Sequence, residues 1–161
     1  MHPALAEVMN QQIAAEFSSA YAYLSMAAYM EGENYPGVAH WLKMQAQEET
    51  EHAMRFFNFV LDRGGQVTLQ QIPQPTAQFA SLEDVFRRVV DHEAHITGLI
   101  NHLYEVATRE KDYASIPFLQ SFLTEQVEEE KSAADVLTMV TRAGATPQGM
   151  LLIDQQLGRR Q

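Results

Sequence analysis

Four stretches of this 161-residue chain carry apolar residues at alternating intervals of four and three positions, and polar residues interrupt the middle of each stretch. Positions at these intervals lie on one face of an α-helix, so the chain is predicted to form four long amphipathic helices. The interrupting residues are Glu16 in the first stretch, Glu49 and His52 in the second, Glu93 in the third, and Gln126 and Glu129 in the fourth. A core-facing carboxylate is costly unless it is protonated or bound to a cation, so these positions indicate a chemical site.

Helix-start and helix-stop signals predict where the elements begin and end. Gly32 follows the first apolar stretch, a Gly pair at 64–65 follows the second, and Ser81 with Asp84 resembles a capping box before the third. The predicted helices span residues 3–31, 35–63, 81–111, 113–143 and 147–157, with an extended crossover over residues 65–80. The sequence therefore predicts one all-α domain over residues 1–161, in which two antiparallel helical hairpins form a four-helix bundle and a short fifth helix follows.

The polar residues are predicted to meet at one depth of this bundle. The turns of the two hairpins centre on Glu33 and Asp112, and the interrupting residues lie at similar separations from these turns. Since each residue adds about 1.5 Å to a helix, the remaining differences in height amount to roughly one helical turn. Both hairpins should therefore bring their polar residues to their midpoints.

These polar residues have the chemistry of a metal site. Glu49 and His52 form a Glu-x-x-His pair, which places an oxygen and a nitrogen ligand side by side on one helix. Together with Glu16, Glu93 and Glu129 they make four carboxylates and one imidazole, a set suited to two first-row transition-metal ions. The alternative is a group of ordinary buried polar residues paired with basic side chains or with each other, but no Lys or Arg occupies the middle of any stretch.

Several neighbouring residues are open to two interpretations. Tyr23 lies two turns after Glu16 on the same face, where it could hydrogen-bond a ligand carboxylate, lend an electron, or serve as a plain core residue. Glu48, Glu125 and Glu128 flank the candidate ligands and could form a third cation site with Glu129, although their spacing alone favours a solvated acidic face.

Three histidines on the third predicted helix are interpreted as surface or inter-subunit residues. His92 and His95 fall off its apolar face, and His102 lies further along the same helix. They are therefore not included in the candidate metal site.

Charge and composition narrow the possible partners and location. The chain has 21 acidic and 11 basic residues, for a net charge of −10, which opposes binding to nucleic acid and favours cations. It has no Cys, so thiolate metal sites and Cys nucleophiles are excluded. The beginning of the chain lacks a secretory pattern, and no stretch approaches the roughly 18 apolar residues of a membrane span. We therefore expect a cytoplasmic protein that contacts neither membrane nor nucleic acid.

Four motifs of this chain resemble those of the prokaryotic non-haem ferritins, and the resemblance extends over essentially the whole chain. The motifs are QQIAAEFSSAYAYLSM, HWLKMQAQEETEHAMRFF, DHEAHITGLIN and SFLTEQVEEEK. The resemblance implies the ferritin-like bundle and a di-iron centre. In that centre Glu16, Glu49 and His52 would bind iron A, and Glu49 would bridge to an iron B that Glu93 and Glu129 also hold.

The same resemblance assigns the neighbouring residues. It implies that Gln126 lies beside iron B, where it could position oxygen. It also matches Glu48, Glu125, Glu128 and Glu129 to the third iron site of bacterial ferritins.

Departures from related families refine the expectation. Bacterioferritins have a haem-ligating Met after the bridging Glu, where this chain has Thr50, and a Glu-x-x-His on the fourth helix, where it has Gln126 to Glu129. Haem is therefore not expected. The DNA-protecting mini-ferritins place their ligands between subunits and lack a fifth helix, so they fit this chain less well.

The resemblance also implies an activity. The protein would be a ferroxidase that oxidises Fe(II) with O2 or H2O2 and stores Fe(III) as mineral inside a hollow octahedral shell of twenty-four copies, with the fifth helix near the fourfold axes. Two alternatives from other classes remain at this point: a soluble di-iron oxidase or peroxidase acting on an organic substrate, and a helical structural protein without metal chemistry.

Overall fold

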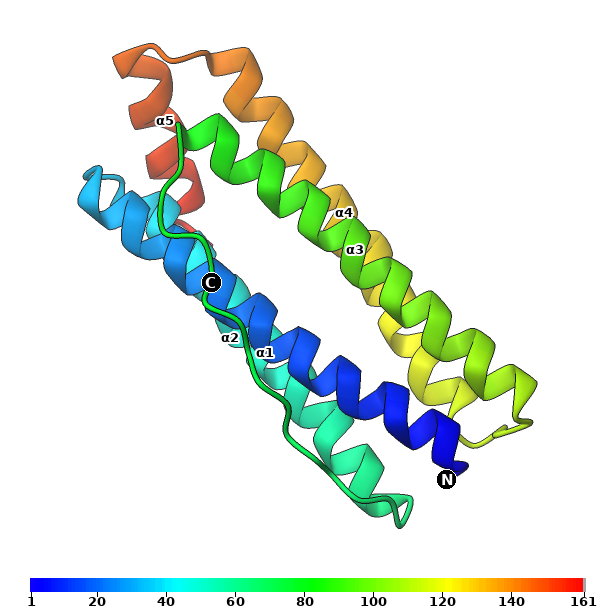
Figure 1. Cartoon of the computed structure of the whole chain (residues 1–161). Helices are drawn as coiled ribbons and strands as arrows, with labels where there is room; N and C mark the ends of the chain where they lie inside the picture. Colours follow the sequence, from blue (N-terminus) through cyan, green and yellow to red (C-terminus); the bar gives the residue numbers. More distant parts are fainter. Residues whose placement is uncertain (161) are drawn as a thin grey trace.

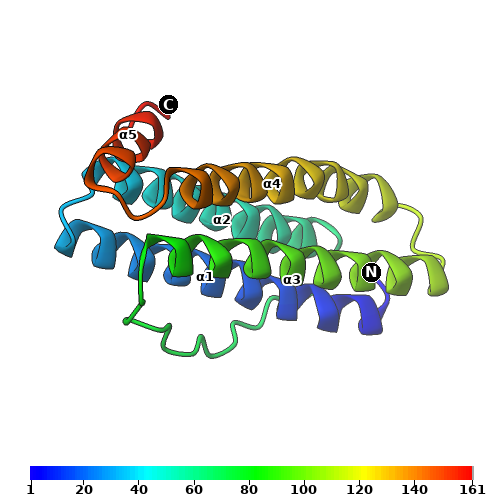
Figure 2. The same cartoon turned by 90° about the horizontal axis from the view of Figure 1, so that it is seen from above.

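Five helices and one long crossover make up the computed structural model, which describes residues 1–160. The helices are α1 (Pro3–Gly32), α2 (Pro36–Asp62), α3 (Leu82–Arg109), α4 (Ile116–Ala143) and α5 (Pro147–Leu157). Figures 1 and 2 show the α1/α2 hairpin alongside the α3/α4 hairpin, with α5 packed across one end of the bundle. The prediction of an all-α bundle with a short fifth helix is confirmed.

The crossover between α2 and α3 runs along the outside of the bundle beside α1 (Figure 2). Two side chains of α1 hold it. The Asn10 side chain donates to the carbonyl of Gln66 at 3.0 Å and accepts from the N–H of Thr68 at 2.7 Å. Farther along, the Ser25 hydroxyl donates to the carbonyl of Thr76 at 2.6 Å. These contacts satisfy backbone groups of a segment that has no regular secondary structure.

The start of α4 differs from the prediction. The helix begins at Ile116 and not at residue 113, because residues 111–115 form a turn. Lys111 has a φ of 55°, and the hydroxyl and the N–H of Ser115 both donate to Asp112, at 3.0 Å each. Arg63 at the end of α2 holds this turn through an ion pair of 2.9 Å with Asp112. The other helix ends lie within about two residues of their predicted positions, the usual uncertainty of helix boundaries.

The buried apolar residues form two clusters that lie at opposite ends of the bundle. One cluster, at the α5 end, uses residues 23–30 of α1, 38–46 of α2, 82–89 of α3 and 133–140 of α4. The other uses residues 5–13 of α1, 56–60 of α2, 96–107 of α3 and 119–122 of α4. The polar residues that interrupt the four apolar stretches fall between these clusters on all four helices. The predicted common depth is therefore present in the structure.

Helix α5 is attached to the bundle through the beginning of α2. The carboxylate of Asp154 accepts hydrogen bonds from the N–H groups of Gly37 at 2.7 Å and Val38 at 2.9 Å. It thereby caps a helix whose own N-cap residue, Tyr35, provides no side-chain hydrogen bond. Gly37 is required here because a Cβ atom at that position would lie 1.9 Å from the carbonyl oxygen of Asp154.

None of the helices within residues 1–160 combines the length and the apolar character that crossing a bilayer requires.

Candidate metal centre

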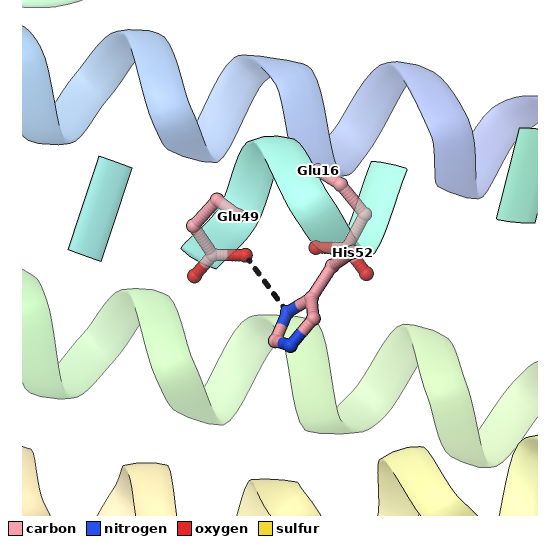
Figure 3. A group of neighbouring side chains, drawn as sticks. All are labelled: Glu16, Glu49 and His52. Carbon is pink, nitrogen blue, oxygen red and sulfur yellow. Dashed lines mark ion pairs between the residues drawn. The ribbon is translucent and has the colours of Figure 1, made fainter. Parts of the chain in front are cut away.

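Glu16, Glu49 and His52 form a compact group in the middle of the bundle. Glu16 comes from α1, and the other two residues stand one turn apart on α2 (Figure 3). Each offers one ligand atom, and these atoms all lie within 4.8 Å of one another. The Glu49 Oε2 atom lies 3.5 Å from His52 Nδ1. Two carboxylates and an imidazole at these separations can bind a single first-row transition-metal ion.

Two oxygens of this group are buried without a hydrogen bond. Glu16 and Glu49 are only 0% and 3% exposed, and the Oε2 atom of each has no hydrogen-bond partner within the described part of the chain. The other oxygen of Glu16 accepts from Gln12 Nε2 at 2.8 Å. Buried polar atoms are almost always paired, so an unpaired carboxylate oxygen requires a specific explanation. A cation between the two carboxylates would satisfy both atoms.

Glu93 lies on the facing helix α3 and is held by two neutral donors. It is 1% exposed, and the hydroxyl of Tyr23 donates a short hydrogen bond to its Oε1 atom. Gln126 Nε2 lies 3.3 Å from the Oε2 atom and 3.2 Å from the hydroxyl of Thr97. The hydrogen bond that the sequence suggested for Tyr23 is therefore present. No basic side chain neutralises Glu93 among residues 1–160.

Glu129 on α4 is half-buried and accepts a hydrogen bond of 3.1 Å from Gln45 Nε2. Its charge, like that of Glu93, raises the pKa of Glu49, so the three carboxylates act on one another. Across residues 1–160, however, the group with all its ligand atoms within 4.8 Å contains only Glu16, Glu49 and His52. Glu93 and Glu129 border that group from the opposite hairpin.

The four carboxyl groups bind protons more tightly than exposed carboxyl groups do. Burial and the charge of Glu49 raise the pKa of Glu16 well above its ordinary value. Burial and the charge of Glu93 raise the pKa of Glu49 to about 8. Burial also raises the pKa of Glu93 and of Glu129, although hydrogen bonds from Tyr23 and Gln45 oppose these increases. A cluster of like charges in the buried interior therefore favours protons or a cation.

The outer acidic cluster, defined here as Glu48, Glu125 and Glu128, differs from the inner carboxylates in its partners. Glu48 forms an ion pair of 2.6 Å with Arg160, and Glu125 forms one of 2.6 Å with Arg55. Glu128 is exposed. Within the described residues these three side chains and Glu129 do not make a compact ligand group. The sequence-based interpretation of a third cation site thus remains a prediction.

The two arginines were missed by the sequence reasoning. Arg55 stands one turn after His52 on α2, a spacing that could have revealed it. Arg160 lies 112 residues from Glu48, and no local pattern indicates that contact.

His92 corrects the interpretation that all three histidines of α3 are surface residues. Its Nε2 atom lies 2.6 Å from the hydroxyl of the buried Ser19, and its ring packs edge-on against Tyr23 with the centroids 5.8 Å apart. Burial and the neighbouring His95 lower its pKa to about 4. His92 is half-buried because its position on α3 faces α1. His95 and His102 are exposed in the subunit.

A four-helix bundle with a buried carboxylate and imidazole group at its centre is typical of the carboxylate-bridged metal proteins. Comparisons with known proteins identify the family within that class. Residues 6–143 match the model of the ferritin-like domain. A bacterial non-heme ferritin of Bacteroides fragilis is 40% identical over 156 residues, which cover 97% of each chain. One of Staphylococcus aureus is 36% identical and covers 97% of this chain and 94% of the relative.

Solved structures agree with these matches. An open-pore ferritin of the hyperthermophilic archaeon Archaeoglobus fulgidus superimposes with a TM-score of 0.98 at 40% identity, covering 100% of this chain and 98% of the other. The chain therefore belongs to the ferritin family. This membership supports a role in iron storage.

Proposed function

We propose that this protein stores iron and is a ferroxidase, an oxidoreductase that oxidises Fe(II) at a di-iron centre inside each subunit. The observation that carries the proposal is that one buried oxygen of Glu16 and one of Glu49, beside His52, accept no hydrogen bond. Hydrogen-bond donors contact Glu93 and Glu129, whereas neither of these two atoms accepts a hydrogen bond from residues 1–160, and Glu49 Oε2 has only its 3.5 Å contact with His52 Nδ1. A divalent cation would do so and would displace the protons that the raised pKa values of the carboxyl groups favour.

Two ferrous ions would be bound as substrate. Glu16, Glu49 and His52 would hold the first ion, and Glu49, Glu93 and Glu129 the second, with Glu49 bridging. Four carboxylates carry the charge that two divalent ions neutralise, so the filled site would be close to neutral. Since the second group comes from the opposite hairpin, both halves of the bundle would be needed to assemble the pair.

The protein would contribute positions, and the iron would supply the electrons. Each of the two ferrous ions gives up one electron, and O2 takes up both electrons with two protons to form H2O2. When H2O2 is the oxidant, it takes up two electrons and two protons and forms two molecules of water. Tyr23 would keep Glu93 oriented through its hydrogen bond, and Gln126 lies beside Glu93, where it could position the oxidant. Ferric product would then leave the site for storage as mineral.

Aromatic side chains fill the space next to the site, which argues against the alternative of an oxidase for organic substrates. Phe122 packs edge-on against the His52 ring with centroids 5.4 Å apart, and Phe56 stacks on Phe122 at 4.4 Å. Phe118 closes the same cluster at 5.1 Å from Phe122. An organic substrate would have to displace these rings, whereas ferrous ions and oxygen are small.

The surface of the subunit supports assembly into a homo-oligomer. Leu151 and Leu152 on α5 are 57% and 63% exposed, and Tyr113 and Val127 are more than two-thirds exposed. Leu151 and Leu152 are adjacent on α5, and exposed apolar side chains that lie together in this way are often covered by a partner subunit. A hollow shell of twenty-four copies would cover them. Electron cryomicroscopy of the purified protein would distinguish a closed octahedral shell from the open-pore arrangement described for the archaeal relative.

The central test is aerobic addition of Fe(II) to metal-free protein, with oxygen consumption, ferric absorbance and particle size followed together. Wild-type protein should oxidise about two ferrous ions per subunit in a fast phase and then retain a growing mineral. Glu49→Ala should lose at least about 90% of the fast phase, because the bridging ligand serves both ions. Glu51→Gln, an exposed change on the same helix, is the matched control. Wild-type initial rates in a correctly assembled Glu49→Ala protein would refute the assignment.

A further inference from the structure

The end of the chain returns to the neighbourhood of the metal centre. Beyond α5, the guanidinium of Arg160 forms an ion pair of 2.6 Å with Glu48 Oε2 through its Nη2 atom. Its Nη1 atom donates a short hydrogen bond to the side-chain oxygen of Gln45. The guanidinium also lies over the ring of Trp41, 5.0 Å from its centroid. The ring Nε2 of His40 lies 2.8 Å from the Arg160 carbonyl oxygen and can donate to it.

The docking of α5 determines where Arg160 lies. Arg160 follows α5 by three residues, and α5 is attached to the start of α2 through the Asp154 carboxylate. Gly158 makes the next contact, since a Cβ atom there would lie 3.0 Å from the Cα of Gly37. The side chain of Arg160 is only 23% exposed as a result. The arginine is thus held in place at four points and is not a free surface cation.

Arg160 is also connected to a candidate ligand. Because the oxygen of Gln45 accepts from Arg160, the amide nitrogen of Gln45 faces Glu129 and donates to its Oε2 atom at 3.1 Å. The positive charge of Arg160 adds to this effect, since it opposes the burial that raises the pKa of Glu129. Glu48 has the opposite influence on Glu129, and Arg160 neutralises Glu48.

We propose that Arg160 is a tethered cation that binds Glu48 in place of a metal ion and so limits each subunit to two tightly bound metal ions while its tail is docked. The inference rests on the proposed di-iron site, and it adds that Arg160 limits metal binding at the outer acidic cluster beside that site. Guanidinium carries its charge at all physiological pH values. Here its Nη2 atom contacts Glu48 while its Nη1 atom contacts Gln45, so Arg160 is a permanent competitor for Glu48. A divalent ion at the outer acidic cluster would have to displace Arg160 or do without Glu48.

The test is a titration of assembled, metal-free protein with Zn2+, which needs no oxidant and reports binding without activity. Wild-type protein should bind two Zn2+ per subunit tightly. Arg160→Gln should bind a third ion about tenfold more tightly than wild type does, a modest factor because the ion pair is partly exposed. Arg159→Gln removes the same charge from the adjacent exposed residue and should behave as wild type.

Two further variants separate charge from structure. Arg160→Lys keeps the positive charge and should not gain the third ion. The double variant Arg160→Gln with Glu48→Gln should lose the gain, because the freed carboxylate is the proposed ligand. Equal third-ion binding in Arg160→Gln and Arg159→Gln, with two tight ions still bound, would overturn the role of Arg160 and leave the di-iron site standing. If wild-type protein does not bind two Zn2+ ions tightly per subunit, both proposals are overturned.

Discussion

Replacing Glu49 by Gln removes a buried negative charge while it keeps the shape of the side chain. Glu49 is 3% exposed, and burial together with the charge of Glu93 raises its pKa from 4.5 to about 8. Between these two pH values the unfolded chain has released the proton that the folded, metal-free protein still holds. The folded state is therefore progressively disfavoured as the pH rises from 4.5 to 8, and Glu49→Gln should remove this effect.

The pKa values determine the size of the expected change. Each unit of difference between folded and unfolded pKa corresponds to about 1.4 kcal/mol. At pH 7 the wild-type protein should be less stable than Glu49→Gln by about 3 kcal/mol per subunit, whereas at pH 5 the difference should be below about 1 kcal/mol. The gain should stop growing above pH 8, where Glu49 is ionised in both states.

Unfolding of the metal-free proteins by guanidinium chloride at pH 5, 7 and 8.5, in the presence of a chelator, measures this difference in the free energy of unfolding. Size-exclusion chromatography must show the same assembly for both proteins, because subunit association adds its own stability. Glu51→Gln makes the same chemical change at an exposed position of α2 and should alter stability by less than about 0.5 kcal/mol at every pH.

Saturating Zn2+ should reverse the order of stability. Metal binding to the folded state stabilises wild-type protein, and Glu49→Gln lacks the bridging carboxylate needed for the full effect. An equal or lower stability of the metal-free Glu49→Gln protein at pH 7, or a gain that does not change with pH, would refute the account of Glu49 as a buried, proton-binding carboxyl group.

Three further outcomes are expected. Zn2+ affinity should rise at least about tenfold between pH 6 and pH 8, because binding must displace carboxyl protons; calorimetry in two buffers should detect their release, and pH-independent binding would contradict this. Gly37→Ala should lower the free energy of unfolding by about 1–3 kcal/mol, because the new Cβ would clash with the Asp154 carbonyl. The control Gly98→Ala, which lies in open space on α3, should not destabilise the protein. Gly144→Ala should lose about 1–3 kcal/mol in thermal unfolding, because a φ of 61° with a ψ of −180° suits only glycine, and an unchanged melting temperature would count against that strain.

Much of the bundle could be predicted because helical periodicity is a local property of the sequence. The intervals around Glu16, Glu93 and Glu129 place these residues on core-facing or half-buried positions, and the helices on which they lie pair over short turns. Similar distances from the turns then bring them to one level. The start of α4 was predicted less well, because a turn stabilised by the distant Arg63 replaced its first residues.

Contacts between residues from distant parts of the chain could not be predicted from helical periodicity. The face that His92 turns toward Ser19 depends on how α1 and α3 pack, and a helical period does not specify the neighbour of a residue beside the apolar face. The same holds for the outer acidic cluster. Its residues have the same charge as the inner carboxylates, but two of them are paired with arginines.

The sequence alone thus determined the helical bundle, its crossover and the level at which five candidate ligands gather, since each follows from spacing along one helix or from the length of one hairpin. Only the tertiary structure decided which carboxylates have partners. It left one oxygen of Glu16 and one of Glu49 without a hydrogen bond in the buried interior, and it paired Glu48 with Arg160. The physical reason is that burial and pairing depend on contacts between segments, and those contacts form only when the helices pack.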